Sequence, residues 1–241
     1  MDFEKLCFIS QQFFVNCEIL NIETVESGCI NKTYIVEHLN NGIKSKFVLQ
    51  SLSKIFKSHK IVNKNHKLVT DHMYKKINDK DFNLQFSKWE VPDLIKCKSN
   101  NMFVFPFESY FWRAMVYIND TLSFDFLEDE MMAYQAGLGL AKFHIICSDI
   151  DASILENSIS NFHNTNYYIE QYFISLKEFD FEKLNDFENN RVHSLINCLS
   201  KHFGYVESLY ESLINSNIDQ NVIHGDPKIS NFLFDIDYKH V

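Results

Sequence analysis

The chain has 241 residues, of which 46% are hydrophobic, enough to build the core of one large domain or of two small lobes. A formal net charge of −9 argues against a nucleic-acid-binding surface, because such surfaces hold phosphates with clustered lysine and arginine. The sequence has neither a run of about 18 apolar residues nor a secretory signal, so we expect a cytoplasmic protein without a membrane partner.

Cysteines and histidines give no pattern typical of a metal site. The six cysteines are scattered singly, without a C-x-x-C pair, which favours free thiols in a reducing compartment over zinc or disulfides. The ten histidines include no H-E-x-x-H motif, and the chain has no G-x-S-x-G motif of a serine hydrolase. These classes of enzyme are therefore not supported.

The first 118 residues are predicted to form a β-rich lobe. Apolar residues at helical spacing predict helices, and runs rich in branched and aromatic residues predict strands. The turn signal Asn40-Asn41-Gly42 predicts a hairpin between the first two clear strands. In chain order the predicted elements are a helix at 3–15, strands at 33–36 and 46–50, a helix at 58–78, and strands at 102–107 and 112–118.

Residues 119–241 are predicted to be mainly helical. Amphipathic patterns predict helices at 130–147 and within 181–215, and the polar residues 119–123 are the expected hinge between two lobes. The expected fold class is therefore α+β, with a β-rich N-terminal lobe at 1–118 and a helical C-terminal lobe at 119–241.

The most informative segment runs from Val222 to Asp235 and has the sequence VIHGDPKISNFLFD. It is predicted to be a short apolar strand, a polar loop and a second apolar strand, Phe232 to Phe234. The loop offers a carboxylate at Asp226 and a carboxamide at Asn231. Phosphoryl transfer from a metal-bound nucleotide needs one group that accepts the proton of the acceptor hydroxyl and another that holds the metal. A plain Asp-Pro turn between two strands is the alternative, because Gly, Asp, Pro, Ser and Asn all form turns.

The string H-G-D-x-x-x-x-N resembles the catalytic loop of the aminoglycoside phosphotransferase and choline kinase superfamily, which has a protein-kinase-like fold of two lobes. Within it, the chain is most similar to the N-acetylhexosamine 1-kinase branch, and the resemblance covers most of residues 20 to 237. The segments that carry this narrower likeness are 28–34, 47–50, 112–118 and 161–165.

The resemblance implies an ATP- and Mg²⁺-dependent kinase that phosphorylates a small hydroxyl compound such as an amino sugar. Asp226 would be the catalytic carboxylate and Asn231 a metal ligand, while His224 would orient the loop. His163 and Asn164 would lie near the sugar, although a polar loop with a helix N-cap at Asn164 or Thr165 is the simpler explanation of both. The residues implied in nucleotide binding are Gly28, Asn31, Thr33, Gln50, Tyr117 and Ile118.

Gln50 departs from most protein-kinase-like proteins, which carry a phosphate-binding lysine at the end of the third strand. Gln50 can donate and accept hydrogen bonds but brings no charge. Lys46 lies on the same face of the strand by period two and could supply one. For Arg113 both a structural role and a place in the pocket remain open.

Members of the resembled family carry a further metal-binding aspartate in a strand after the catalytic loop, followed by helices that complete the substrate lobe. The sequence stops at Val241, where that strand should begin, and Asp235 and Asp237 are expected in a turn. We therefore expect a truncated helical lobe and weak or no activity from these 241 residues alone.

Two other functions remain open at this stage. One keeps the chemistry but changes the acceptor to choline, ethanolamine, homoserine or an aminoglycoside. The other is a non-catalytic module that binds a nucleotide or another partner. The oligomeric state does not follow from the sequence.

Overall fold

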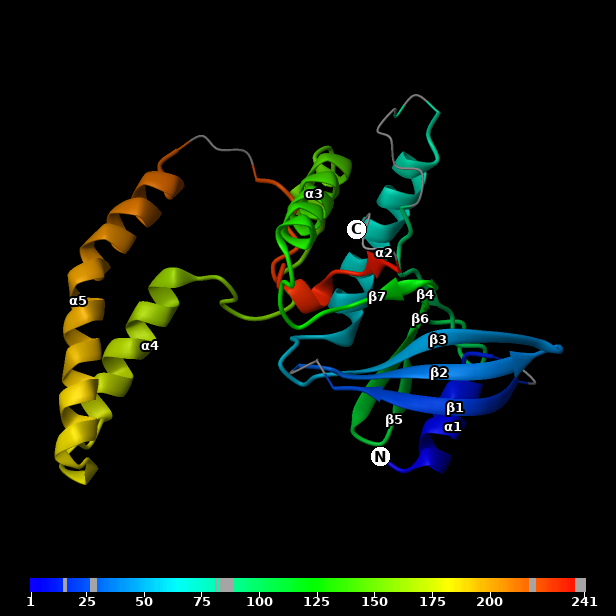
Figure 1. Ribbon diagram of the computed structural model, residues 1–241, viewed down its shortest axis with the longest axis horizontal. Coiled ribbons are helices and arrows are strands. Elements are labelled where there is room, and N and C mark those ends of the chain that lie inside the picture. Colours follow the sequence, from blue (N-terminus) through cyan, green and yellow to red (C-terminus); the bar gives the residue numbers. More distant parts are fainter. Residues whose placement is uncertain (15–16, 27–29, 81, 83–88, 217–219, 237–241) are drawn as a thin grey trace. The chain divides into compact units, whose positions relative to one another are not determined.

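The structure is a computed structural model that describes residues 1–14, 17–26, 30–80, 82, 89–216 and 220–236 (Figure 1). The chain is α+β. Its described elements are, in order, α1 (Phe3–Gln11), β1 (Cys17–Val25), β2 (Lys32–Asn40), β3 (Ile43–Leu52), α2 (His59–Ile77), β4 (Leu94–Ile95), β5 (Phe105–Phe107), β6 (Tyr110–Val116), β7 (Thr121–Leu122), α3 (Glu130–Cys147), α4 (Thr165–Glu178), α5 (Asp186–Ile214) and β8 (Phe234–Asp235).

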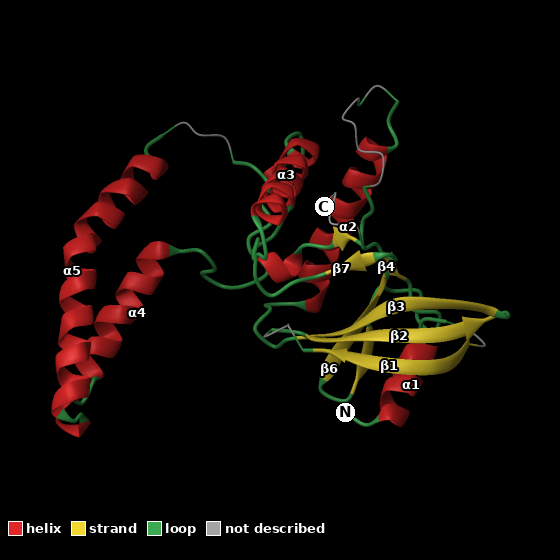
Figure 2. Cartoon of the chain, in the orientation of Figure 1, coloured by secondary structure: helices red, strands yellow, loops and turns green. Residues whose placement is uncertain are grey.

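Most strands belong to one antiparallel sheet with the order β1-β2-β3-β6-β4, and β5 pairs with β6 outside this path. Figure 2 shows β1, β2 and β3 as a twisted meander. The predicted hairpin turn is confirmed, because Asn41 and Gly42 join β2 to β3 with φ angles of 51° and 79°. Positive φ angles at both positions suit Asn-Gly and match the twist of the paired strands.

Helices α1 and α2 contact opposite faces of the sheet, α1 at the main core and α2 near the edge formed by β4 and β6. Helix α1 buries Leu6 and Ile9 against alternate residues of β2, β3 and β6, as the period of two in a strand requires. The other face carries α2, from which Asn63 reaches Arg113 of β6. The main core on the α1 side consists of Leu6, Ile9, Phe13, Tyr34, Val36, Phe47, Leu49, Cys97, Trp112 and Ala114.

A second apolar cluster joins α2 and α3 to the segment that precedes the predicted catalytic loop. Met73 of α2, Ile146 and Cys147 of α3, and Val222 are all buried in it. Burial raises the pKa of the Cys147 thiol to about 11, so this cysteine is a protonated core residue near neutral pH. All five described cysteines are free thiols: Cys7, Cys17, Cys97, Cys147 and Cys198.

The chain divides into two compact units, which differ from the predicted lobes at 1–118 and 119–241. The first unit comprises 1–160 and 221–241, and the second comprises 161–220. The predicted lobe boundary between 118 and 119 stays a prediction. The sheet, α2, α3 and the loop with Asp226 and Asn231 all belong to the first unit.

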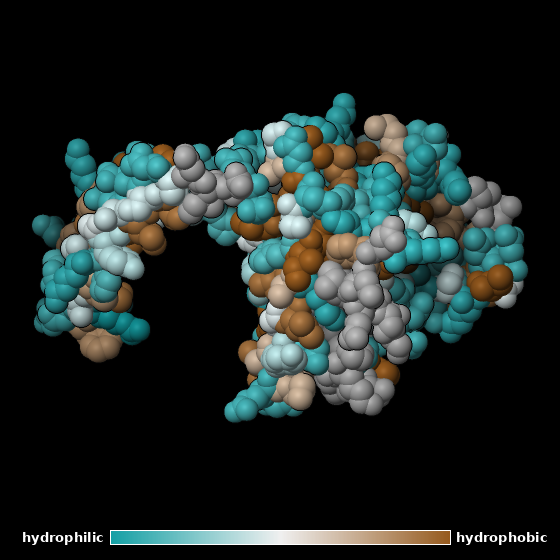
Figure 3. All heavy atoms as spheres, turned by 90° about the horizontal axis from the view of Figure 1, so that it is seen from above, coloured by the Kyte–Doolittle hydropathy of each residue, from teal (hydrophilic) through white to brown (hydrophobic). Residues whose placement is uncertain are grey.

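The second unit is a pair of helices. Helix α5 begins with a capping box, in which the Asn185 side chain accepts a hydrogen bond from the Glu188 amide and the Glu188 carboxylate accepts one from the Asn185 amide. Phe203 of α5 packs on Tyr172 and Phe173 of α4, with ring centroids 5.2 and 5.3 Å apart. Many apolar side chains of this pair reach the surface, as the brown atoms at the left of Figure 3 show.

The prediction of two strands around the catalytic loop is wrong in part. Val222 and Ile223 form no strand; the Val222 side chain is buried in the apolar cluster that joins α2 and α3. Of the second predicted strand, Phe232 to Phe234, only Phe234 lies in a strand, namely β8 (Phe234–Asp235), which pairs with β7 and not with residues 222–223. Asp235 lies in β8, so its prediction as a turn residue is also wrong, and Asp237 lies outside the described residues.

Across the part of the chain that the structure describes, no helix combines the length and the apolar content needed to cross a membrane.

Candidate functional site

The predicted catalytic loop brings Asp226 and Asn231 into direct contact. Gly225 precedes Asp226 with a φ of 82°, a conformation that glycine adopts without a steric penalty. A short 3₁₀ turn, Ile229–Asn231, then carries Asn231 back toward Asp226. The Asn231 Nδ2 donates to the Asp226 carbonyl oxygen at 2.7 Å and to Asp226 Oδ2 at 3.0 Å.

The loop is fixed at both of its ends. On the upstream side, His224 Nδ1 accepts a hydrogen bond from the Asp226 amide at 3.3 Å, and the His224 ring lies edge-on to Phe143 of α3. On the downstream side, Phe234 is fully buried and β8 pairs with β7. The loop is therefore held between α3 and the segment that follows the main sheet.

The contact between Asp226 and Asn231 leaves oxygen atoms for a cation. Both hydrogen bonds of the Asn231 amide use Nδ2, so Oδ1 remains the atom that a metal ion would take. Both residues are exposed. Mg²⁺ prefers oxygen ligands and commonly uses one or two protein groups together with nucleotide phosphates. The donor set of this loop fits that chemistry.

No group of three or more His, Cys, Asp or Glu residues that would hold a metal by themselves occurs among the described residues. A divalent cation at Asp226 and Asn231 would therefore need further ligands from a bound nucleotide or from water.

A second polar group lies on the α2 side of the main sheet. Thr33 of β2, Gln50 of β3 and Arg113 of β6 are register neighbours and form one row across three strands. The Gln50 Nε2 donates to Thr33 Oγ1 at 3.0 Å. The Arg113 Nε and Nη2 both donate to Gln50 Oε1, at 3.0 and 2.7 Å. Gln50 is thus the residue that orients the arginine.

Arg113 is a buried cation whose partners are neutral. Its exposed fraction is 8%, and its third hydrogen bond runs from Nη1 to Asn63 Oδ1 at 3.4 Å. None of the ion pairs found among the described residues includes Arg113. Burial lowers the pKa of Arg113 to about 10, which still leaves the guanidinium charged at neutral pH.

An apolar row lies next to this polar row on the same face of the sheet. It consists of Ile35, Val48 and Met115, of which the first two are half-buried. Beyond it, the Lys46 Nζ lies 5.6 Å from the centre of the Tyr117 ring. An apolar strip between a buried cation and an aromatic ring is a surface on which a flat heterocycle can lie.

Tyr117 and Ile118, which the resemblance implies in nucleotide binding, follow β6 directly. The Ile118 carbonyl accepts a hydrogen bond from the Thr121 hydroxyl at 2.9 Å, which fixes the chain as it enters β7. Residues 117–118 lead into β7, and the Asp226 loop leads into β8. Because β7 pairs with β8, this short ladder connects the two segments.

Asn31, one of the residues implied in nucleotide binding, lies in the turn that leads into β2. Its Oδ1 accepts a hydrogen bond from the Ser53 amide at 2.9 Å, so the side chain ties this turn to the end of β3. Gly28 lies outside the described residues. Asn31 and the Thr33–Gln50–Arg113 row lie at the same end of β2, because Lys32 pairs with Ser51 and Thr33 with Gln50.

His163 and Asn164, the predicted substrate residues, belong to the second unit. Asn164 is the N-cap of α4, and its Oδ1 accepts a hydrogen bond from the Tyr167 amide at 3.1 Å. His163 has a φ of 59°, and its amide donates to the Tyr168 hydroxyl at 3.3 Å. Helix capping therefore accounts for Asn164, and a role of either residue in substrate binding stays a prediction.

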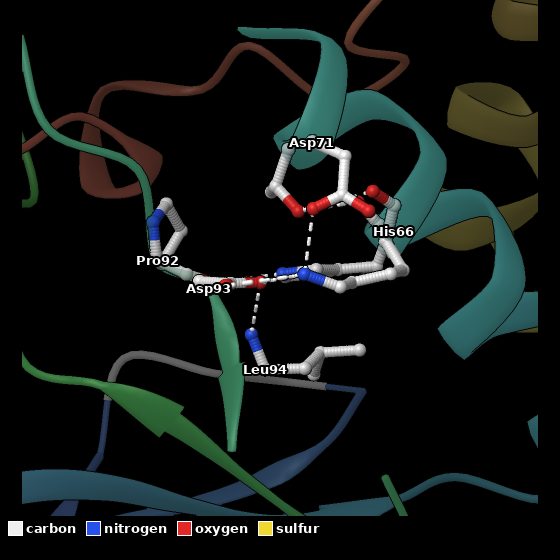
Figure 4. Close-up of polar contacts among 7 residues, drawn as sticks. His66, Asp71, Pro92, Asp93 and Leu94 are labelled. Carbon is white, nitrogen blue, oxygen red and sulfur yellow. Dashed lines mark hydrogen bonds and ion pairs between the residues drawn. The ribbon is translucent and has the colours of Figure 1, made fainter. Parts of the chain in front are cut away.

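Polar contacts hold α2 against the segment that leads into β4 (Figure 4). The His66 Nε2 lies 2.7 Å from the Pro92 carbonyl oxygen, which can only accept, so Nε2 carries the hydrogen. The Lys67 Nζ contacts Asp71 at 2.6 Å and Asp93 at 3.1 Å. These bonds fix the face of the helix that presents its polar side chains to the sheet.

Burial, and to a smaller extent the nearby Arg113 charge, lowers the pKa of His66 to about 4. The ring is therefore neutral in the folded protein at pH 6, whereas in the unfolded chain it begins to take up a proton below its ordinary pKa of about 6.5. The unfolded state then binds more protons than the folded state. Folding stability consequently falls as the pH drops from about 6.5 to about 4.

We expect acidification from pH 7 to pH 4.5 to cost about 1–2 kcal/mol of folding stability through His66, a figure reduced from the full shift because the side chain is partly exposed. His66→Gln retains an amide donor for Pro92 and removes the titration. Urea unfolding at both pH values, for wild type and variant, measures the difference. An equal loss of stability in both proteins would contradict this role.

The sequence leaves the role of Arg113 open and does not mark Asn63 as a functional residue. One signal for Arg113 was available in the apolar run Phe111-Trp112-Arg113-Ala114-Met115. An arginine in a buried strand is rare unless its charge has a binding partner. Asn63 stands among other polar residues of an amphipathic helix, and nothing local distinguishes it.

No protein-family model matches this chain.

Proposed function

We propose that this protein is an ATP-dependent phosphotransferase with a protein-kinase-like arrangement, acting on the hydroxyl group of a small molecule. The observation that carries the proposal is the contact between Asp226 and Asn231, whose side chains lie 3.0 Å apart on a loop fixed at both ends. A carboxylate beside a carboxamide oxygen supplies a proton acceptor and a ligand for a divalent cation.

The sheet adds a surface suited to a nucleotide. The half-buried Ile35 and Val48 offer an apolar floor for adenine, and Tyr117 and Ile118 supply backbone groups at its edge. The row Thr33–Gln50–Arg113 offers hydrogen-bond donors toward the phosphates. Adenine at one row of the sheet and phosphates at the next is an arrangement that the strand register permits.

In the proposed reaction, Asp226 accepts or orients the proton of the acceptor hydroxyl, and Asn231 holds the metal ion through Oδ1. The Mg²⁺ that accompanies ATP would neutralise charge on the transferring phosphoryl group. His224 and Gly225 keep Asp226 in place through the loop geometry. Most of the rate enhancement would come from positioning and from electrostatic stabilisation.

The acceptor that the sequence resemblance favours is an N-acetylhexosamine, with phosphorylation at its anomeric hydroxyl. The acidic chain, with a net charge of −9, is also compatible with a cationic acceptor such as choline. The two classes differ in what the pocket must recognise, hydroxyl groups or a positive charge.

The test is a panel of acceptors with ATP and Mg²⁺, with formation of ADP and of the phosphorylated product as readouts. We expect ATP to bind and turnover to be weak in these 241 residues, with an N-acetylhexosamine phosphorylated faster than choline, ethanolamine, homoserine or an aminoglycoside. Turnover with choline alone would exclude the sugar, and absence of ATP binding in calorimetry would contradict the phosphotransferase proposal as a whole.

A further inference from the structure

We infer that Arg113 is an anion-binding residue that contacts the polyphosphate of the bound nucleotide. It would take over the role of the phosphate-binding lysine, whose position is occupied by Gln50 in this chain. The inference rests on the proposed nucleotide-binding function and names the group that would supply the missing positive charge.

The first observation is the burial of an arginine without a counter-charge. Removing a charge from water costs several kcal/mol unless a partner of opposite sign compensates it. In this protein the guanidinium is 8% exposed, and its acceptors are the neutral oxygens of Gln50 and Asn63. A residue that only held the strands together at this row would not need a charge. The free-energy cost of burying an uncompensated guanidinium is the kind of cost that is expected at functional positions.

The second observation concerns hydrogen bonds that are still to be made. A guanidinium has five N–H groups, and the hydrogen bonds of Arg113 to Gln50 and Asn63 account for three of them. The Asn63 Nδ2 is buried and has no hydrogen-bond partner. An unpaired buried donor costs free energy comparable to that of a lost hydrogen bond. Among the described residues, two N–H groups of Arg113 and the amide nitrogen of Asn63 are therefore still free of an acceptor.

The third observation is the place of the row in the sheet. Thr33 belongs to the register row next to the turn between β1 and β2, and Arg113 lies two strands away in the same row. The side chain of Asn31 ties the end of that turn to Ser53. The cation therefore lies in one row with Thr33 and Gln50, two of the residues implied in nucleotide binding.

Gln50 is suited to this arrangement in a way that lysine is not. Its Oε1 accepts two hydrogen bonds from Arg113 and thereby fixes the plane of the guanidinium, while its Nε2 is held by Thr33. Because glutamine is neutral, the positive charge of Arg113 stays available for an anion. A planar guanidinium binds phosphate oxygens with paired hydrogen bonds, which a lysine cannot do.

The experiment compares ATP, adenosine and inorganic tripolyphosphate as ligands in titration calorimetry of the complete chain. We expect Arg113→Met to weaken ATP about tenfold to hundredfold, since one or two charge-assisted hydrogen bonds are lost. The same variant should lose tripolyphosphate binding and keep the wild-type affinity for adenosine. Arg113→Lys should bind ATP with intermediate affinity.

Lys46→Met is the matched control, because it removes the other cation on the same face of the sheet, beside Tyr117. We expect its ATP affinity to stay within about twofold of wild type. If Arg113→Met fails to fold, Gln50→Glu neutralises the same guanidinium without removing it and should also weaken ATP but not adenosine.

Unchanged ATP affinity in a folded Arg113→Met, or loss of ATP binding only in Lys46→Met, would overturn the inference. A wild type that binds neither ATP nor tripolyphosphate would also overturn the inference. Binding of tripolyphosphate that depends on Arg113, without binding of ATP or adenosine, would support the anion site and contradict the proposed kinase function.

Discussion

Asp226→Asn is expected to reduce phosphoryl transfer to the acceptor by about 10²–10⁴-fold, the contribution typical of a positioned general base. The substitution preserves the shape of the side chain and still offers Oδ1 to the Asn231 amide, which now bonds Asp226 Oδ2 at 3.0 Å. The loop should therefore keep its conformation and lose only the group that accepts the proton. Steady-state formation of phosphorylated product measures the effect.

Asp235→Asn is the control for that substitution, because it removes a carboxylate from the strand that follows the same loop. Its rate should stay within about twofold of wild type, and both variants should melt at the wild-type temperature. An Asp226→Asn variant that retains full turnover would exclude this carboxylate as the proton acceptor.

Gln50→Lys is expected to destabilise the protein, although it introduces the residue that most protein-kinase-like proteins carry at this place. Arg113 would lose the acceptor of two of its hydrogen bonds and gain a like charge on the neighbouring strand. We expect a loss of about 3 kcal/mol, which lowers Tm by roughly 6–12 °C in a chain of this size.

Gln50→Glu is the matched variant with the opposite sign. A glutamate has nearly the same shape, keeps an acceptor for both Arg113 hydrogen bonds and adds a counter-charge, while Thr33 can donate its hydroxyl instead of accepting. We expect this variant to be as stable as wild type or more so. Thermal unfolding of the three proteins measures the series. A Gln50→Lys variant that is more stable than Gln50→Glu would show that Arg113 is not held as a buried charge.

Elements with strong local periodicity could be predicted from the sequence. The amphipathic pattern predicts α3 at 130–147, and the structure has it at Glu130–Cys147. The helix predicted at 58–78 is α2, and the Asn41-Gly42 turn joins β2 to β3 as expected. In these segments the local preference and the tertiary packing favour the same conformation.

The surroundings of the catalytic loop were harder to predict because they depend on contacts between distant parts of the chain. Val222 and Ile223 have the composition of a strand, but they form none, and the Val222 side chain packs against α2 and α3 instead. The β7–β8 ladder consists of two residues on each strand, too few for any periodic signal.

The candidate site was predictable to different degrees at different residues. Asp226 and Asn231 follow from one contiguous motif, and their five-residue spacing lets a short 3₁₀ turn close the contact. The link from Gln50 to Arg113 depends on the pairing of β3 with β6, whose register cannot be inferred without knowing the strand order. Asn63 enters the site only through the packing of α2 on the sheet.

Metal binding at the loop is the most direct test of the central claim, and Mn²⁺ serves as the probe. Electron paramagnetic resonance of Mn²⁺ with ATP should report a protein-bound metal–nucleotide complex in the wild type. Asn231→Leu, which removes the Oδ1 ligand, should weaken that complex by at least about tenfold while ATP without metal binds as before. Equal Mn²⁺ affinity in both proteins would contradict the assignment of Asn231 and, with it, the phosphoryl-transfer site.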